Sequence, residues 1–149
     1  MLLRVIEVVA ALSSSLFAGA ALYINAAEHP ARMGLDTAAA AAQRAPSYRR
    51  ATWLQAPLAL VSCVSGLWSW SMGAGAGWVA AAILIGLVVP FTLLGVMPTN
   101  RELLAPGRDL ASGQTRALLE AWGKLHAVRT VASLLATTLC LWLLSAAKP

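Results

Sequence analysis

Residues 78–97 read WVAAAILIGLVVPFTLLGVM and contain no charged side chain. A helix needs about 20 mostly apolar residues to cross the hydrocarbon core of a bilayer. Lipid offers the backbone no hydrogen-bond partners, so a stretch of this kind is expected to be helical. The segment therefore predicts a transmembrane helix.

Three further stretches are similarly long and mostly apolar, at residues 5–24, 54–72 and 122–145. Together the four stretches predict an all-α transmembrane four-helix bundle that forms a single integral membrane domain over residues 1–149. A cleaved secretory signal is the alternative for the first stretch. Glu7 in the would-be basic region and the length of the apolar run favour a membrane span instead.

Composition supports the same class of protein. Of the 149 residues, 59% are hydrophobic and 11% are charged, whereas soluble domains carry about 25% charged residues. These values argue against a disordered chain, a disulfide scaffold with only two cysteines, and an ordinary soluble enzyme. The net charge of +5 comes from eleven thinly spread Lys and Arg residues. A nucleic-acid partner is therefore not expected, whereas a lipid bilayer is.

The basic residues also predict an orientation. Eight of the eleven lie in the segments before and after the two central spans: Arg32, Arg44, Arg49, Arg50, Arg101, Arg108, Arg116 and Lys124. Cytoplasmic loops carry an excess of Lys and Arg. We therefore expect segments 25–53 and 98–121 to be cytoplasmic loops and both termini to lie outside, in a bacterial-type inner (plasma) membrane. In the first loop, Asp36 or Thr37 is expected to cap a short helix that ends before Pro46.

Polar residues within the last span fall on one helical face. Trp122, His126, Arg129 and Ser133 follow at spacings of four, three and four residues. Arg129 is expected to lie roughly 10 Å deeper than Trp122. It should face the bundle interior, pair with a carboxylate, or extend towards the near interface.

The ends of the first and third spans are polar as well. Pro30 is expected to break the first helix near His29, and Pro90 to kink the third. These ends should meet the last span at one leaflet. The side chains expected to converge there are Tyr23, Glu28, His29, Asn100, His126 and Arg129.

These residue types suit several kinds of chemistry. An imidazole can take up a proton near neutral pH, and a guanidinium can stabilise a developing oxyanion. His29, His126 and Glu28 would also suit a non-haem iron site, and two histidines on separate helices would suit haem. In the simplest alternative, His29 and Glu28 are solvated interface residues and His126 bonds a helix carbonyl.

Several runs of residues together resemble one known family. They are GAALYIN (19–25), EHPAR (28–32), VPFT (89–92), MPTNREL (97–103) and LEAWGKLHAVRT (119–130). In combination they resemble the anthrone-oxygenase-like family of small four-helix membrane proteins. The resemblance implies oxidation of a hydrophobic aromatic or quinone-type molecule by O2. It implies no required cofactor, although haem or a transition metal stays an alternative.

The resemblance also suggests roles for individual residues. His126 would be the general base, and Arg129 and Asn100 would stabilise an enolate oxygen. Tyr23 and Trp122 would line an aromatic pocket, with His29 as a second base or a partner in binding. The competing interpretation is a non-catalytic membrane subunit, or a small-molecule or haem carrier. Its small-residue helix faces would then pack against partners, including a second copy of the chain.

Overall fold

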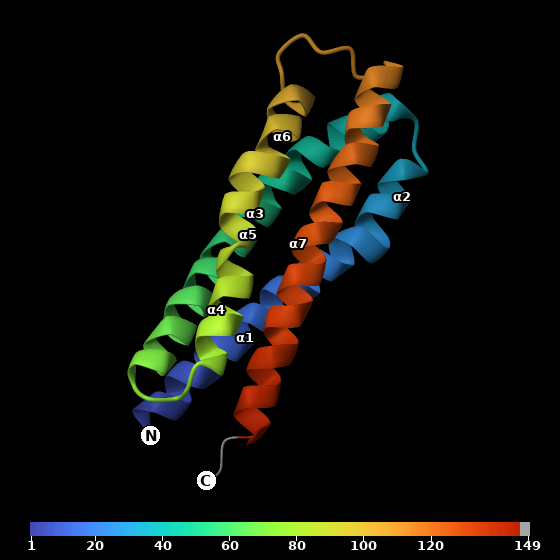
Figure 1. Cartoon of the computed structure of the whole chain (residues 1–149). Coiled ribbons are helices and arrows are strands. Elements are labelled where there is room, and N and C mark those ends of the chain that lie inside the picture. Colours follow the sequence, from blue (N-terminus) through green and yellow to red (C-terminus); the bar gives the residue numbers. More distant parts are fainter. Residues whose placement is uncertain (147–149) are drawn as a thin grey trace.

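The computed structural model describes residues 1–146 as four long antiparallel helices (Figure 1). The N-terminus, the turn at residues 72–76 and the end of α7 (Gly113–Ala146) lie together, at what we call the terminal end. The opposite end, the loop end, carries the connections at residues 34–36 and 104–112. The predicted all-α four-helix architecture is confirmed.

The first long helix comprises α1 (Leu2–Tyr23), the π-helical turn η1 (Ile24–Glu28) and α2 (His29–Met33). The break expected at His29 is absent, because the chain stays helical through Pro30. In η1 the amide of His29 bonds the carbonyl of Ile24, five residues earlier. This wider turn takes up the place where the proline ring would otherwise clash with the preceding turn.

The second long helix, α3 (Thr37–Ser71), is much longer than expected. Asp36 caps it by accepting a hydrogen bond from the amide of Ala39 at 2.9 Å. The prediction that this helix ends before Pro46 is wrong, since α3 runs on through Pro46 and Pro57. Both prolines lie on the exposed side of the helix, where their rings do not disturb the packing against neighbouring helices.

The third long helix is made of four parts: α4 (Gly77–Gly86), α5 (Val88–Phe91), η2 (Thr92–Val96) and α6 (Met97–Leu103). Its interruption at Leu87 fits the expected kink, because the Pro90 ring opposes the carbonyl of the residue four positions earlier. The π-helical turn η2 ends two residues before Pro98, just as η1 ends two residues before Pro30.

Each of the four long helices is apolar and long enough to cross a membrane. The 34 residues of α7 give a length of about 50 Å, well beyond the roughly 30 Å of a hydrocarbon core. Segments 25–53 and 98–121, expected as loops, are therefore mostly helical extensions of the spans. The chain is an integral membrane protein whose helices continue past the predicted spans at the loop end.

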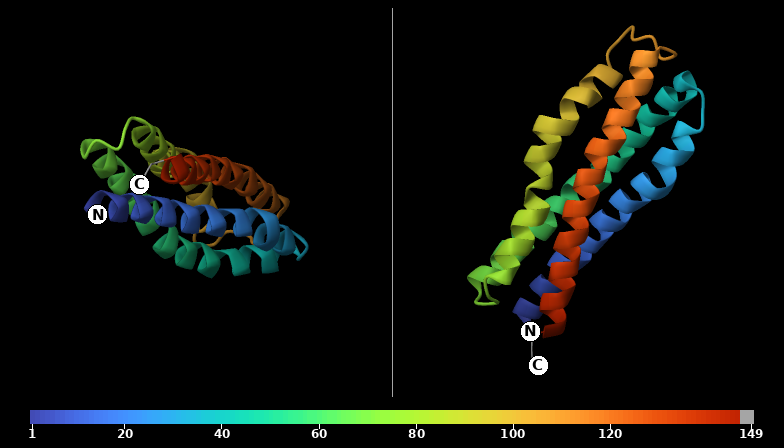
Figure 2. Two further views of the ribbon diagram at one scale, coloured as in Figure 1. Left: turned by 90° about the horizontal axis from the view of Figure 1, so that it is seen from below. Right: turned by 45° about the vertical axis from the view of Figure 1, so that its right-hand side comes forward.

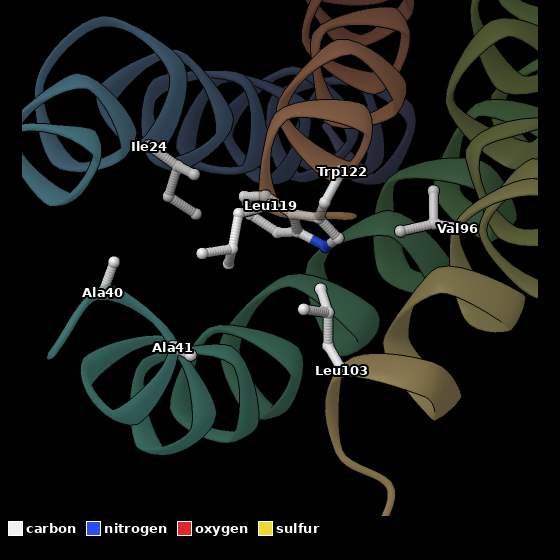
Figure 3. Close-up of a cluster of buried hydrophobic side chains, with 7 residues drawn as sticks. All are labelled: Ile24, Ala40, Ala41, Val96, Leu103, Leu119 and Trp122. Atoms are coloured by element: carbon white, nitrogen blue, oxygen red, sulfur yellow. The ribbon is translucent and has the colours of Figure 1, made fainter. Parts of the chain in front are cut away.

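The interior is built from three apolar clusters along the bundle axis. Alanine dominates the two clusters nearer the terminal end, which allows close helix contact. Ser62 adds a hydrogen bond from its hydroxyl to the carbonyl of Ala10 at 2.9 Å. The third cluster lies at the loop end (Figure 3) and comprises Ile24, Ala40, Ala41, Val96, Leu103, Leu119 and Trp122.

Helix α3 and the third long helix are close at one end only. In the right-hand view of Figure 2, α5 and α6 diverge from α3 towards the loop end. At the other end, a Cβ atom added to Gly66 would lie 3.1 Å from the Cβ of Ala82 and 3.2 Å from the carbonyl oxygen of Trp78. Glycine is thus needed where α3 and α4 touch.

Replacing Gly66 by valine is expected to destabilise the protein by about 1–3 kcal/mol, because the side chain overpacks the contact between α3 and α4. The change would appear as a lower unfolding temperature in detergent. Gly19→Val is the matched control, since a Cβ atom at Gly19 has no neighbour within 4 Å. Equal unfolding temperatures for both variants would contradict the close α3–α4 contact.

Candidate functional site

Buried serines occur along much of the bundle, but the buried polar side chains larger than serine, apart from Glu7, gather in the half nearer the loop end. Polar groups at membrane depth are costly unless they are bonded or face a cavity. They come from all four long helices and comprise Arg32, Arg44, Gln55, Asn100, Thr115, His126 and Thr130. This half of the molecule is therefore the candidate site.

His126 is the most completely enclosed histidine, with 1% of its surface exposed. Its Nδ1 lies 2.7 Å from the Oδ1 of Asn25, and the Thr130 hydroxyl donates to the same oxygen at 2.5 Å. The Asn25 amide nitrogen donates to the carbonyl of Gly123 at 3.2 Å. With the amide oriented in this way, Oδ1 can only accept, so Nδ1 of His126 carries the proton. The neutral ring then has its lone pair on Nε2.

Trp122 lies between the two histidines and the basic groups. Its ring centroid is 4.9 Å from that of His126 and 5.5 Å from that of His29. The guanidinium carbon of Arg44 is 4.9 Å from the Trp122 ring centroid, within the range of a cation–π contact. The predicted neighbourhood of Trp122, His126 and His29 is thus present in the structure.

Sequence reasoning missed Arg44, which it treated only as a loop charge. Arg44 is 1% exposed, donates to the Oδ1 of Asn100 on α6 and lies 5.2 Å from the ring of Tyr48. The signal was available, because residues 44, 48 and 55 share one face if the helix continues through Pro46. Asn100, expected beside Arg129, instead bonds Arg44.

Arg32 is the centre of a second cluster of polar side chains, which come from the first and second long helices. It pairs with Glu28 and donates to the side-chain oxygen of Gln43 at 2.5 Å. The hydroxyl of Ser47 also donates to Glu28. The carboxylate of Glu28 therefore accepts hydrogen bonds from a guanidinium and a hydroxyl, and Glu28 is not simply a solvated interface residue.

Arg129 turns into the bundle, which decides among the expectations for it. Its Nη2 donates to the Oε1 of Gln55 on α3 at 2.8 Å. Its guanidinium carbon lies 5.6 Å from the ring centroid of Phe17. Among residues 1–146 it forms no ion pair with a carboxylate, so its charge is balanced only by dipoles.

A small polar cavity lies among these side chains. We call it the inner cavity; its volume is about 20 Å³, slightly more than one water molecule requires. The predicted residues His126, Trp122, Arg129 and Glu28 line it, whereas His29, Tyr23 and Asn100 do not. Eight further residues complete its lining: Ile24, Arg32, Arg44, Ser47, Tyr48, Ala51, Thr52 and Gln55.

A larger apolar opening adjoins the inner cavity. This lateral cleft has a volume of about 160 Å³ and runs between α3 and the α5–η2 segment. It shares the side chains of Tyr48, Thr52, Gln55 and Arg129 with the inner cavity. The side chains of Leu93 and Val89 are exposed at its rim, so the cleft opens on the side of the bundle.

Tyr23 lies elsewhere. It is 62% exposed and lines a shallow outer groove between α1 and α3 together with Glu28, Ser47 and Arg50. The first span thus presents Asn25 and Ile24 to the interior but carries Tyr23 on its outer side. Tyr23 and Trp122, expected to line one aromatic pocket, therefore line different cavities in the structure.

The residues proposed as metal ligands do not form a ligand set. Within residues 1–146 no three His, Cys, Asp or Glu side chains are placed to hold one metal ion. Glu28 is engaged by Arg32, and Nδ1 of His126 is engaged by Asn25. Because the donors do not converge, we derive no reaction step through a metal or haem.

Comparison with known proteins adds an independent finding. The profile of the family described as Anthrone oxygenase matches residues 45–139, well over half of the chain. Anthrone oxygenase tpcL of Aspergillus fumigatus is 37% identical over 70 residues, covering 45% of this chain and 44% of that protein. No solved structure matches the chain. The matched segment includes Trp122, His126 and Arg129, and the chain belongs to the anthrone oxygenase family.

Proposed function

We propose that this membrane protein oxidises a hydrophobic aromatic ketone at an acidic methylene group with O2, and that His126 is the general base. One observation carries the proposal. The bond from Nδ1 of His126 to Asn25 leaves the lone pair on Nε2, and His126 lines the inner cavity. The name of the relative, anthrone oxygenase, points to the same class of reaction.

The reaction begins with transfer of a proton from the methylene carbon to Nε2 of His126. The electron pair of the broken C–H bond delocalises onto the ketone oxygen as an enolate. The guanidinium group of Arg129 lines this cavity and the adjoining lateral cleft, and a preorganised positive charge stabilises such an oxyanion. The protein thereby lowers the cost of forming the anion.

The enolate then supplies the electrons for reduction of O2. A C–O bond forms at the former methylene carbon, and the proton held by His126 returns to give a hydroperoxide. Loss of one water molecule leaves a second carbonyl group. One substrate and one O2 thus yield one quinone and one water, and the electrons come from the substrate itself.

The lateral cleft suits an apolar substrate delivered by the bilayer. Its volume of about 160 Å³ is close to that of a cavity that holds one benzene ring, about 150 Å³. The cleft opens between membrane-spanning helices, so a lipid-dissolved molecule reaches it without crossing water. Tyr48 supplies aromatic surface to both the cavity and the cleft, and Trp122 supplies it to the inner cavity.

We propose in addition that the loop end faces the cytoplasm. The exposed arginines Arg49, Arg50 and Arg101 lie in the helical extensions at that end, and excess positive charge marks the cytoplasmic side. In the same orientation the N-terminus and the 72–76 turn face outwards.

Cysteine labelling tests this orientation. After Cys63 and Cys140 are replaced by serine, we expect Ala76→Cys to react with a membrane-impermeant maleimide in intact cells. Ala111→Cys should react only after the membrane is permeabilised. Both positions are exposed, so accessibility alone does not separate them. The reverse pattern would contradict the proposed orientation.

The role of His126 is tested by His126→Gln. We expect O2 consumption with 1,8-dihydroxyanthrone to fall by roughly 10²–10⁴-fold, the usual contribution of a general base. Spontaneous oxidation is subtracted with membranes lacking the protein, and the unfolding temperature confirms that the variant folds. Loss of turnover in His29→Gln but not in His126→Gln would transfer the role of base to His29. Binding of anthrones by the wild type without turnover would favour a carrier.

Asn25→Leu tests whether the contact with Asn25 fixes the tautomer of His126. The variant removes the acceptor for Nδ1–H and frees the ring to rotate or exchange tautomer, so kcat should fall by about tenfold or more while substrate binding changes little. Thr130→Val is the comparison variant. It leaves Asn25 in place and removes the Thr130 hydroxyl, which also donates to Oδ1 of Asn25. Unchanged kcat in Asn25→Leu would show that the Asn25 contact does not orient a base.

A further inference from the structure

We propose that the inner cavity is an anion-binding subsite that receives a carboxylate group, with the aromatic body of the same ligand in the lateral cleft. This inference rests on the proposed function and specifies its substrate class: an aromatic molecule with a fixed negative charge. The oxidised methylene is a separate group of that molecule.

The charges around the cavity are unbalanced. Arg32, Arg44 and Arg129 line it, and Glu28 is the one carboxylate among the lining residues. Glu28 is already paired with Arg32. Within residues 1–146, Arg44 and Arg129 take part in no ion pair. Buried charges normally have a partner of opposite sign, so these side chains favour an anion as the ligand of the cavity.

The hydrogen-bond donors around the cavity also favour an anionic ligand. Five lining side chains have a buried N–H group without an acceptor: Arg32 Nη1, Arg44 Nε, Gln55 Nε2, Trp122 Nε1 and Arg129 Nε. All five groups are donors. The side chains of Arg32, Arg44, Gln55 and Trp122 are at least 96% buried. Most buried polar groups in proteins are satisfied, so this set indicates an absent acceptor.

A carboxylate fits these donors better than water does. Water has only two acceptor sites, whereas an ionised carboxylate has about four and accepts well from arginine. With a volume of about 20 Å³, slightly more than one water molecule requires, the inner cavity accepts only the oxygen end of a small planar head group. A tetrahedral phosphate ester needs more room and has a further substituent to place.

The aromatic part of the ligand would extend from the inner cavity into the lateral cleft. The lateral cleft is apolar and adjoins the inner cavity, with which it shares the side chains of Tyr48, Gln55 and Arg129. A ring attached to the carboxylate would lie beside Tyr48 and Val88, and any further rings would extend towards the rim. The ligand is thus an amphiphile with its charged end innermost.

Binding to the purified full chain in dodecyl maltoside tests the proposal by isothermal calorimetry. The probes are anthraquinone-2-carboxylate and anthraquinone-2-carboxamide, which share the ring system and differ in charge. We expect the carboxylate to bind at least about tenfold more tightly, because hydrogen bonds to an ionised acceptor are roughly twice as strong as neutral ones. Equal affinities would overturn the proposal.

Variants of Arg44 test whether this side chain binds the carboxylate. Arg44→Gln should remove most of the preference for the carboxylate, and Arg44→Lys should keep part of it, which protects the test if the glutamine variant does not fold. Arg49→Gln is the matched control, since Arg49 lies on the same helix but is exposed and lines neither the cavity nor the cleft. An unchanged preference in folded Arg44→Gln would also overturn the assignment.

A third arm identifies the source of the anion. Dihexanoyl phosphatidic acid should not displace anthraquinone-2-carboxylate; displacement would assign the cavity to a lipid phosphate and overturn the carboxylate. The outcome is separable from the proposed function. Turnover of an uncharged anthrone without preference for the acid would leave the oxidation standing and remove this inference. Charge-selective binding without any turnover would do the opposite.

Discussion

A guanidinium group placed inside the bundle governs the layout of the loop-end half. Arg44 on α3 is 1% exposed, so its charge has to be met by protein groups rather than by water. Asn100 from α6 accepts its hydrogen bond, Trp122 from α7 offers a ring face, and Tyr48 adds a second ring from the next turn of α3. One side chain thereby connects three of the four long helices.

The same connection explains why a cleft exists there at all. At the terminal end α3 and α4 touch through Gly66 and Ala82. Towards the loop end α5 and α6 move away from α3, and long side chains bridge the gap instead of backbone contact. Bridging side chains leave space between them, whereas packed alanines do not. The inner cavity and the lateral cleft lie in this space.

Much of the fold was predictable because membrane insertion constrains it strongly. About 20 mostly apolar residues, such as 78–97, have few structures open to them in lipid, and four such stretches give a four-helix bundle. The helical extensions were not predictable by the same rule. The local preference of a residue before proline predicts helix ends near Pro30 and Pro46. The π-helical turn before Pro30 and the exposed position of Pro46 on α3 removed the steric objection in each case.

The candidate site was predictable only in part, for a related reason. His126, Trp122 and Arg129 share a face of one uninterrupted helix, and the spacing alone placed them together. Arg44 and Gln55 were missed because the helix that carries them was assumed to end. Tyr23 does not join the site, because residues two positions apart lie on different sides of a helix and Asn25 is the one that faces the interior.

The two π-helical turns also affect how the bundle can change during evolution. Each holds one residue more than an α-helical turn, and removing one residue rotates everything beyond it by about 100°. A deletion within residues 24–28 would leave an apolar helix that still crosses the bilayer. It would swing Glu28 and Arg32 away from Gln43 and Ser47 on α3, however, and remove both side chains from the lining of the inner cavity. In this fold a gap of a single codon can therefore separate a membrane scaffold from the polar site that it carries.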